Sequence, residues 1–555
     1  MTRVGLLVVP ILVIVVMGWA RRWNLEDAFL NYRIVDQIRA GHGPVFNVGQ
    51  RVEVGTSPLW LWTLVVVRTV VPFVKIELSA AFVGLVGTAA GLWWAQLGAS
   101  RLWGQGSERL LVPVGALVYA FLPPSWDWAT SGLENGMTIA WLGALMLVLG
   151  TVARRETAVP RGKLAALGVL VGLGPLLRPD LALATLTVTV ALLWMIRPKL
   201  ADMLRFLAAL VALSVLYEIF RAGYYATLVP NTALAKDASG SYWHDGWNYL
   251  LDLVVPYRLL IPLAAAVAVL GFAFAKRSGL RRPGVVAVLA MPVAGALHAL
   301  FMTKTGGDYL HARLLLPSLF MLLAPIAALP RRRWLAAPIV VIGIWAILAG
   351  GWFRPHTASV LLVPITDYNV AQSRGMMQGL TKPGHRPLLA SDFAVPDADL
   401  ARRLQRQGRR DLVSILGPPL RDATPSRTTL ISTLSGVAGY AAGPEVFVHE
   451  ANALADVVGS RMPAVPGAAA GHRKREPWPW MIAMTTRPGV DAGEAPDEVR
   501  AARRALDCGA LAAVQRATQE RLTLGRFVGN IAHSYGWTTM VVPRDPFQAE
   551  RQLCG

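Results

Sequence analysis

The sequence predicts a polytopic α-helical membrane protein that ends in a soluble domain of mixed α/β structure. Long apolar runs recur from residue 4 to residue 352. The 555 residues are 54% hydrophobic and only 16% charged, whereas soluble globular proteins usually carry about 25% charged residues. Residues 353–555 lack such runs, and roughly 200 residues are ample for one hydrophobic core. We therefore divide the chain into a membrane domain, 1–352, and a C-terminal domain, 353–555.

The apolar runs supply nine to eleven candidate membrane crossings, several of them short for a bilayer that requires about 20 residues. The first run lacks a small-residue cleavage site, so we interpret it as a retained helix. The hairpin 163–196 either crosses twice, which gives eleven crossings, or is re-entrant, which gives nine. The candidates are 4–20, 78–100, 109–122, 135–151, 163–177, 180–196, 202–220, 258–275, 284–302, 312–330 and 335–352.

A further apolar run, 58–74, is not counted as a crossing. It contains Arg68 and opens with Trp60 and Trp62 close together. We expect it to be re-entrant or to lie along the outer membrane interface, where tryptophan is favourable.

The connecting segments alternate in charge, and this alternation predicts the topology. One set is basic: 101–109, 154–163, 197–205, 276–282 and 331–333. The other set carries acids, tryptophans and glycines: 21–57, 123–134, 178–180, 221–257 and 303–311. The positive-inside rule places the basic set and the N-terminus in the cytoplasm, and the second set and the C-terminal domain on the periplasmic, extracytoplasmic side of the plasma membrane. The same rule accounts for much of the net charge of +20, so nucleic acid is not predicted as a partner.

The two cysteines, Cys508 and Cys554, are the only ones in the chain. No metal motif fits two cysteines this far apart, and a disulfide is the simplest interpretation if the domain lies in an oxidising compartment. No Walker, Rossmann or HExxH motif is found, and no His/Cys cluster suggests zinc. We predict neither a metal site nor a cofactor, although a requirement for a divalent cation stays open.

The outer segment 21–57 carries an acidic pair, Glu26 and Asp27, at the start of a predicted helix over 26–40. Asp27 lies within the apolar arc of this helix, whereas Glu26 lies on its polar side. We therefore expect Asp27 to point into the protein and Glu26 to meet a polar loop or solvent. The alternative is purely structural: Asn24 would cap the helix, and acids in a first turn are favoured by the helix dipole.

The other outer segments supply carboxylates and cations that could form a site with this pair. Carboxylates suit a general base, and Arg, Lys and His suit a phosphate group. Some of these residues also have a purely structural interpretation. Glu134 could be an acid in the first turn of a helix, and Arg178 and Asp180 could form an ion pair that only clips the chain. Lys236 could lie in a solvated loop, and His311 could have a structural role. We expect Asp308 and His311 to share one helical face. The full set is Glu134, Arg178, Asp180, Lys236, Asp308, His311 and Arg313.

Several motifs spread along the chain resemble one family. They include Glu26-Asp-Ala-Phe-Leu-Asn-Tyr-Arg33, Gly41-His-Gly-Pro-Val-Phe-Asn47, Arg51-Val-Glu53, Thr56-Ser-Pro58, Thr130-Ser-Gly-Leu-Glu134, Arg178-Pro-Asp180, Gly223-Tyr-Tyr225, Val229-Pro-Asn-Thr-Ala-Leu-Ala-Lys-Asp237, Gly306-Gly-Asp308 and His533-Ser-Tyr535. The sequence resembles the AftB-type terminal arabinofuranosyltransferases of mycobacteria and relatives, within the GT-C glycosyltransferase superfamily. Family members carry Asp-Asp where this chain has Glu26-Asp27, which leaves the role of Glu26 open.

The resemblance implies a GT-C fold and a pentosyltransferase that uses a polyprenyl-phosphate sugar. Arabinofuranose would move from decaprenyl-phosphoryl-arabinofuranose to arabinan termini of arabinogalactan or lipoarabinomannan through a β-(1→2) linkage. Asp27 would act as the general base, with Glu26 beside it. Arg178, Lys236, His311 and Arg313 would bind the donor phosphate, and Glu134, Asp180 and Asp308 would orient the acceptor or hold these cations.

Two other function classes fit parts of the sequence. Another polyprenyl-phosphate-sugar transferase, such as a mannosyltransferase, fits the acidic outer segment equally. A transporter or a non-enzymatic envelope or motility factor is the second class, but a transporter would place polar groups near mid-membrane rather than in outer loops. In the C-terminal domain, Trp478 and Trp480 could stack on a glycan, or they could pack the domain or touch the membrane.

Overall fold

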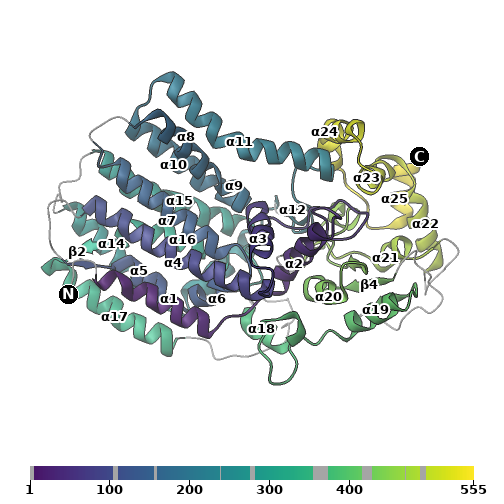
Figure 1. Cartoon of the computed structure of the whole chain (residues 1–555), viewed down its shortest axis with the longest axis horizontal. Coiled ribbons are helices and arrows are strands. Elements are labelled where there is room, and N and C mark those ends of the chain that lie inside the picture. Colours follow the sequence, from purple (N-terminus) through teal and green to yellow (C-terminus); the bar gives the residue numbers. More distant parts are fainter. Residues whose placement is uncertain are drawn as a thin grey trace.

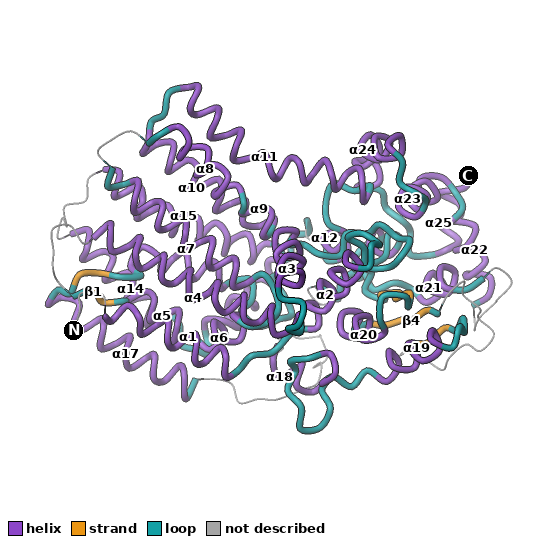
Figure 2. Tube along the Cα trace, viewed as in Figure 1, coloured by secondary structure: helices purple, strands orange, loops and turns teal. Residues whose placement is uncertain are grey.

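The chain forms two parts, a long bundle of helices and a C-terminal domain at one end of it (Figure 1). The computed structural model describes residues 5–103, 110–155, 159–237, 239–275, 282–353, 373–414, 428–468, 471–487 and 495–555. Helices dominate both parts, and the few strands are short (Figure 2).

The helical part begins with the segments that surround the acidic pair. Its first elements are η1 (Gly5–Leu7), α1 (Val8–Ala20), α2 (Glu26–Arg39), α3 (Pro58–Val70), α4 (Ile76–Trp103), β1 (Leu111–Val112), α5 (Val114–Phe121), α6 (Pro123–Ala129), α7 (Asn135–Val152), α8 (Arg161–Gly172), α9 (Gly174–Leu177), η2 (Pro179–Leu181) and α10 (Ala182–Ile196). Its later elements are α11 (Leu200–Tyr225), α12 (Asn231–Ala235), α13 (Trp243–Val254), α14 (Leu260–Ala275), α15 (Arg282–Lys304), α16 (Leu316–Leu323), η3 (Ala324–Ile326), β2 (Leu329–Pro330), η4 (Arg333–Leu335) and α17 (Ala336–Gly351).

Six helical stretches of the described residues are long and apolar enough to cross a membrane. They are α4, α7, α11, α15, η2 with α10, and η4 with α17. Shorter apolar helices occur at Gly5–Ala20, Pro58–Val70, Leu260–Ala275 and Leu316–Ile326. These elements lie at the predicted apolar runs, while the number of crossings stays a prediction.

The segment between α1 and α4 returns to the end of the bundle that it left. Asn24, just after α1, donates a side-chain hydrogen bond to the carbonyl of Glu77 at the start of α4 (3.3 Å). The intervening α3 has 13 residues, about 20 Å of helix against a hydrocarbon core of about 30 Å. This geometry agrees with the expectation that 58–74 does not cross.

Close packing of α4 on α7 stiffens the centre of the bundle. Glycines recur every seven residues on both helices, and they face each other in pairs. A Cβ atom added to Gly143 would lie 2.1 Å from the carbonyl oxygen of Gly91, and one on Gly150 would lie 2.3 Å from that of Gly98. Only glycine permits this backbone approach, as at many helix interfaces in membranes.

Described residues in or beside three of the basic segments lie together at the end of the bundle away from the C-terminal domain (Figure 1). Antiparallel strands β1 and β2 join the residues after 101–109 to those before 331–333, with Leu111 opposite Pro330. Arg154 donates to the carbonyl of Leu102 (2.9 Å), which ties the segment after α7 to the end of α4. The segments 101–109, 154–163 and 331–333, predicted to lie on one side of the membrane, are therefore neighbours where the structure describes them.

The C-terminal domain is built around a small parallel sheet with the order β3-β4-β5. Leu412 pairs with Thr429, and Thr429 pairs with Phe447. The helix α20 connects β4 to β5 and packs against α2. The elements are α18 (Ser373–Gly379), η5 (Ala390–Asp392), α19 (Pro396–Arg406), β3 (Leu412–Ser414), β4 (Thr429–Ser432), α20 (Ser435–Ala442), β5 (Phe447–Glu450), η6 (Gly459–Arg461), α21 (Trp478–Thr485), α22 (Pro496–Leu506), α23 (Gly509–Gln519), α24 (Leu524–Thr539) and α25 (Pro546–Cys554). The predicted architecture, a helical membrane domain with a mixed α/β domain after it, is confirmed.

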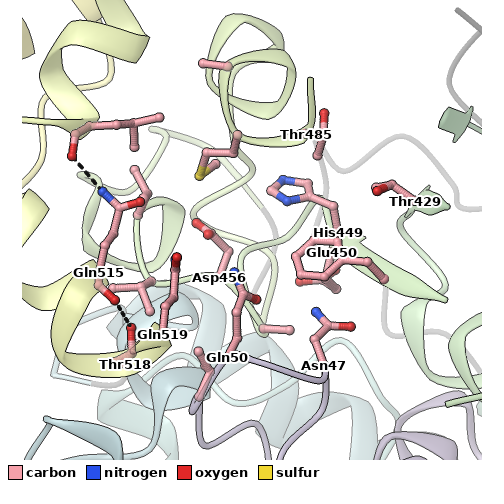
Figure 3. A pocket seen from close by; sticks show the side chains of 18 of the residues that line it. Asn47, Gln50, Thr429, His449, Glu450, Asp456, Thr485, Gln515, Thr518 and Gln519 are labelled. Atoms are coloured by element: carbon pink, nitrogen blue, oxygen red, sulfur yellow. Dashed lines mark hydrogen bonds between the residues drawn. The ribbon is translucent and has the colours of Figure 1, made fainter. Parts of the chain in front are cut away.

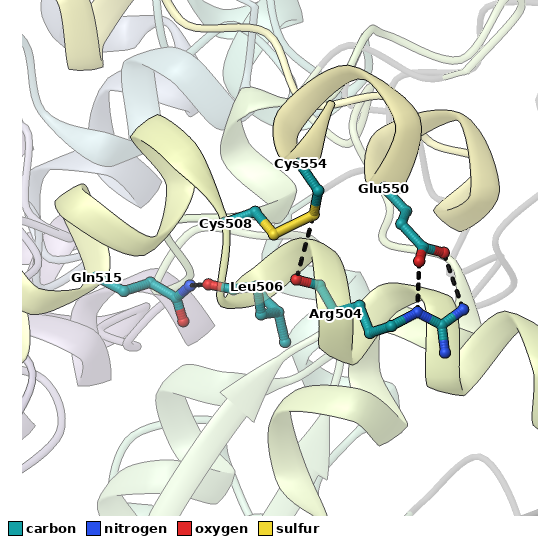
Figure 4. The surroundings of a disulfide bond; sticks show 6 residues. All are labelled: Arg504, Leu506, Cys508, Gln515, Glu550 and Cys554. Atoms are coloured by element: carbon teal, nitrogen blue, oxygen red, sulfur yellow. Dashed lines mark hydrogen bonds and ion pairs between the residues drawn. A yellow bond between two sulfur atoms is a disulfide. The ribbon is translucent and has the colours of Figure 1, made fainter.

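A disulfide joins Cys508 to Cys554 across 46 residues, as predicted (Figure 4). It ties α25 to the turn between α22 and α23. Beside it, Arg504 of α22 forms a two-pronged ion pair with Glu550 of α25. Trp480 is completely buried, and its indole donates to the carbonyl of Arg544 (3.0 Å), so this tryptophan packs the domain.

Two buried arginines of the first outer segment hold the domains together. Arg33 of α2 donates to carbonyl oxygens that surround the end of α20, including those of Gly443 (2.8 Å) and Val446 (2.6 Å). Arg51 donates to the carbonyls of Ala517 (2.5 Å) and Glu520 (2.7 Å) at the end of α23. The segment that carries the acidic pair is thus built into the C-terminal domain.

Candidate active site

A cavity of about 330 Å³ lies at the junction of the two domains. Its walls come from α2, the loop at 54–57, the start of η2, the end of α15, and residues 454, 471 and 473 of the C-terminal domain. The cavity brings together seven of the predicted site residues: Asp27, Glu134, Arg178, Asp180, Lys236, Asp308 and Arg313. The other two, Glu26 and His311, do not line it.

Asp27 occupies the second position of α2, and its carboxylate faces the cavity. The ammonium of Lys236 and the guanidinium of Arg313 each lie 3.8 Å from its Oδ2. Burial disfavours the charged carboxylate, but the attraction of Lys236 and Arg313 outweighs it, and the pKa of Asp27 lies below its ordinary value. Asp27 is therefore ionised at neutral pH.

Glu26 faces away from the cavity, toward the N-terminus of α20. Its carboxylate accepts hydrogen bonds from the backbone N–H groups of Gly436 and Val437. Burial and the neighbouring Asp27 charge raise the pKa of Glu26 well above its ordinary value, although these two hydrogen bonds oppose the rise. The two members of the pair thus have opposite tendencies, with Glu26 favouring the neutral acid and Asp27 the carboxylate.

The capping interpretation of this helix start is wrong. Leu25 is the N-cap residue, and no side chain caps the helix. The amide of Asn24 instead donates to the carbonyls of Glu77 and Leu388 (2.7 Å), and its oxygen accepts the hydroxyl of Tyr32 (2.6 Å). Asn24 therefore fixes where α2 begins relative to α4 and the C-terminal domain.

Arg178 lies between two carboxylates on the wall opposite Asp27. It contacts Glu134 at 3.0 Å and Asp180 at 3.1 Å. Asp180 in turn contacts the buried His298 of α15 at 2.7 Å, and His298 contacts Ser318 at 2.7 Å. The clip between Arg178 and Asp180 is present, and it extends into a chain of polar contacts that locates both side chains.

Arg313 is the cation that bridges Asp27 to a second carboxylate. Asp308 contacts Arg313 at 2.5 Å, and the guanidinium lies 5.8 Å from the centre of the Trp128 ring. The expected shared helical face of Asp308 and His311 is wrong, because residues 307–310 are not helical, residues 311–315 form turns and Ala312 has a positive φ of 64°. Asp308 pairs with Arg313 instead.

His311 lies behind the cavity wall, with both ring nitrogens hydrogen bonded. Nδ1 contacts Asp252 at 2.5 Å, and Nε2 contacts the hydroxyl of Tyr257 at 3.1 Å. Its carbonyl accepts the indole N–H of Trp128 (2.9 Å). These contacts hold the turn that carries Arg313, and they hold the Trp128 ring that lies near the Arg313 guanidinium.

Two further residues of the site come from the C-terminal domain and were not predicted. Arg473 lines the cavity, contacts Asp245 at 2.6 Å and lies 3.5 Å above the ring of Tyr242. The ring of His472 packs 4.6 Å from that of Tyr309. Burial and the charge of Lys236 lower the pKa of His472, so it is neutral beside ionised Asp27. No motif near residue 472 could have indicated this, because the contacts join segments more than 150 residues apart.

Among the described residues, no group of three or more His, Cys, Asp or Glu side chains is arranged to hold a metal ion. The carboxylates of the cavity are each held by a cation rather than by one another. What the arrangement offers chemically is an ionised carboxylate beside two cations in a partly enclosed cavity.

The sequence is similar to two known proteins over most of its length. The terminal β-(1→2)-arabinofuranosyltransferase of Mycobacterium tuberculosis is 31% identical to this chain over 621 aligned residues, which cover 100% of the chain and 98% of that protein. The chain belongs to the AftB family. A protein of the same name from Corynebacterium glutamicum is 31% identical over 578 residues, covering 93% of this chain and 82% of that protein. Residues 414–551 match the AftB family C-terminal domain.

Membership of the AftB family confirms the resemblance and the enzyme class, a glycosyltransferase. The predicted GT-C fold class is confirmed as well. Two crystal structures of ArnT from Cupriavidus metallidurans are also similar. The form bound to undecaprenyl phosphate has a TM-score of 0.46 and 15% identity over 79% of this chain and 74% of that chain. The apo form has a TM-score of 0.41 and 14% identity over 99% and 88%.

Proposed function

We propose that the chain transfers arabinofuranose from decaprenyl-phosphoryl-arabinofuranose to arabinan termini of arabinogalactan or lipoarabinomannan, forming a β-(1→2) linkage in the cell envelope. The observation that carries the proposal is the position of Asp27, an ionised carboxylate 3.8 Å from both Lys236 and Arg313 in a cavity at one end of the helical domain. The sugar and the linkage follow the names of the relatives, and the donor and acceptor follow the family resemblance.

Asp27 is the general base of the proposed reaction. It accepts the proton of an arabinan hydroxyl while the hydroxyl oxygen forms a bond to the anomeric carbon of the donor. The bond between that carbon and the phosphate oxygen breaks, and the polyprenyl phosphate leaves with the electron pair. Because a phosphate is a good leaving group, positive charge suffices to stabilise it and no general acid is required.

Lys236 and Arg313 supply that charge in the proposal. Their attraction lowers the pKa of Asp27 in the free protein, which makes Asp27 a weak base. A bound phosphate would compete for the same two cations and would return the pKa of Asp27 toward higher values. Donor binding would therefore strengthen the base at the moment when it is needed.

The remaining predicted residues take supporting roles. Arg178 is already held by Glu134 and Asp180, so it would contribute to the field around the phosphate as part of a compensated cluster. Asp308 would orient Arg313. His311 was predicted to bind the phosphate, and its contacts with Asp252 and Tyr257 favour a role in positioning the turn that carries Arg313.

We propose that the cavity and the C-terminal domain lie on the extracytoplasmic side of the membrane. Two observations support this side: described residues beside three basic segments gather at the opposite end of the bundle, and the C-terminal domain contains the disulfide.

The test is incubation of the purified protein with synthetic polyprenyl-phosphoryl-arabinofuranose of defined anomeric configuration and an arabinan acceptor, followed by linkage analysis. A new terminal β-(1→2) arabinofuranose is expected, whereas absence of transfer with a folded protein rejects the proposal. The same experiment tests the single displacement, because a direct attack inverts the anomeric carbon. Retention would make Asp27 something other than a simple base, such as a nucleophile.

A further inference from the structure

A second and larger cavity, of about 450 Å³, lies within the C-terminal domain. It is bounded by residues 47–52 of the first outer segment, by β5 and the residues that follow it, and by the facing sides of α21, α22 and α23. Figure 3 shows side chains from the outer segment and from the C-terminal domain around one space. None of the predicted site residues lines this cavity.

Amide and hydroxyl groups dominate the labelled lining in Figure 3. They are carried by Gln50, Gln515, Gln519, Thr429, Thr485 and Thr518. Asn47 shapes this side: its amide donates to the carbonyl of Val448 (2.9 Å) and accepts from the N–H of Val448 (2.9 Å), which fixes the outer segment to β5. The wall between the two domains is therefore rigid where it meets the cavity.

Several of these polar groups keep hydrogen-bonding capacity. Within the described part of the chain, the side-chain amides of Gln50 and Gln519 make no hydrogen bond. The Nε2 of Gln515 donates to the carbonyl of Leu506 (2.9 Å), and its amide oxygen remains able to accept. A terminal amide offers both donors and an acceptor, so it can bind a hydroxyl group in either direction.

The balance of charge argues for a neutral ligand. The cavity carries the acids Glu450, Asp456 and Asp507 as well as the cations Arg487 and Arg503. Glu450 accepts from the N–H groups of Asn452 and Leu454, and Arg503 donates to the hydroxyl of Thr486 (2.6 Å). Lipid tails would leave the amides unpaired, and a polyanion would meet the acids. A hydroxyl-rich neutral molecule, that is, a sugar chain, fits this lining.

The two cavities are neighbours, because nearby residues of two segments line one cavity each. Val52 lines the larger cavity and Val54 the one that holds Asp27, and these residues are about 7 Å apart along an extended chain. On the other side, Ala455 and Leu454 are consecutive and line one cavity each. The amide of Asn231 holds this turn through the carbonyls of Ala453, Leu454 and Asp456 (3.0, 2.9 and 2.9 Å).

We propose that this second cavity binds inner residues of the neutral arabinan acceptor, while the terminal residue of the same chain reaches Asp27. The inference rests on the proposed function and adds to it a second, non-catalytic subsite. A polymer that occupies both cavities is held at two points, so a long acceptor gains affinity that a short one cannot.

The test compares a disaccharide and an octasaccharide of arabinofuranose as acceptors at saturating donor. The double variant Gln50→Ala, Gln519→Ala removes two amides, and Gln519→Trp fills the space from the exposed end of α23. We expect each to lower the ratio of kcat/KM for the octasaccharide to that for the disaccharide about tenfold, through a higher KM. Gln552→Ala and Gln552→Trp are the matched controls, because Gln552 is exposed on α25 and lines neither cavity.

Binding of the octasaccharide to the Asp27→Asn protein, measured by calorimetry, tests the same site without turnover. We expect Gln519→Trp to weaken this binding about tenfold and Gln552→Trp to leave it unchanged. An unchanged length ratio together with unchanged binding overturns the inference, even when transfer to the disaccharide is normal. If the unsubstituted protein transfers no sugar, the proposed function is overturned instead. The binding measurement then still decides whether this cavity holds the sugar chain.

Discussion

The two cavities of this protein are neighbours, yet their side chains differ in kind. The cavity at the domain junction is lined by charges, four carboxylates and the cations paired with them. The cavity inside the C-terminal domain is lined mainly by amides and hydroxyls. The difference shows what each can stabilise: charge developing on a leaving phosphate requires fixed cations, whereas a neutral sugar requires donors and acceptors without a net field.

The strongest way to break this comparison is Asp27→Asn. A general base of this kind is typically worth about 10² to 10⁴ in rate, so kcat should fall by at least that factor. Donor binding should persist, because Asn removes the carboxylate and leaves both cations. Rates in a lipid-linked arabinose assay and the unfolding temperature are the measurements. Transfer at the unsubstituted rate by a well-expressed Asp27→Asn protein would sink the assignment.

The charged character of the junction cavity is tested by Lys236→Met. Loss of a cation that meets the phosphate should lower kcat/KM for the donor about 10- to 100-fold, with a smaller effect on acceptor KM. Lys382→Met is the control, since Lys382 is exposed in the C-terminal domain and lines neither cavity. Equal losses for donor and acceptor would show that Lys236 does not bind the phosphate.

The pH dependence sharpens the same point. Transfer requires ionised Asp27, so the rate falls as the pH drops through its pKa. Burial raises the pKa of Asp27, and Lys236 is the largest of the influences that lower it. Lys236→Met should therefore raise the pKa and move the acid limb of the pH–rate profile to higher pH. A limb that stays in place, or moves to lower pH, contradicts the electrostatic coupling between these residues.

The smallest expected effect concerns Glu26. Because its pKa lies well above the ordinary value, Glu26→Gln preserves both the neutral form and the acceptor for Gly436 and Val437. We expect a change in kcat within about threefold, whereas Glu26→Ala leaves two buried N–H groups unpaired and costs about 1–3 kcal/mol of stability. Thermal unfolding and kcat measure the two effects. A loss of activity with Glu26→Gln as large as that with Asp27→Asn would make both carboxylates catalytic.

Much of the membrane domain could be predicted because its signals are local. Apolar runs identify helices one at a time, and basic segments mark one end of the bundle. The separation of Asp27 from Glu26 was also local, since a helical period of 3.6 residues puts adjacent positions on different faces, and only Asp27 lines the cavity. The disulfide could also be predicted, because two cysteines allow only one pairing.

Predictions that depended on local periodicity failed where the chain is held by distant contacts. In the structural alternative Asn24 would cap α2, but its amide donates to carbonyls at residues 77 and 388. Asp308 and His311 were expected on one helical face, but His311 pairs with Asp252 and its segment is not helical. In both cases a contact with a residue far along the chain is present where a local one was considered.

The sequence by itself determined the class of protein, its division into two parts and its family, and it made Asp27 the proposed base. Each of these follows from composition, short-range periodicity or motifs, which act within a few residues. Only the tertiary structure decided which cations face Asp27, that Glu26 serves the C-terminal domain, that Arg473 and His472 join the site, and that a second polar cavity lies behind it. Those facts depend on side chains separated by tens to hundreds of residues, and folding alone fixes their distances.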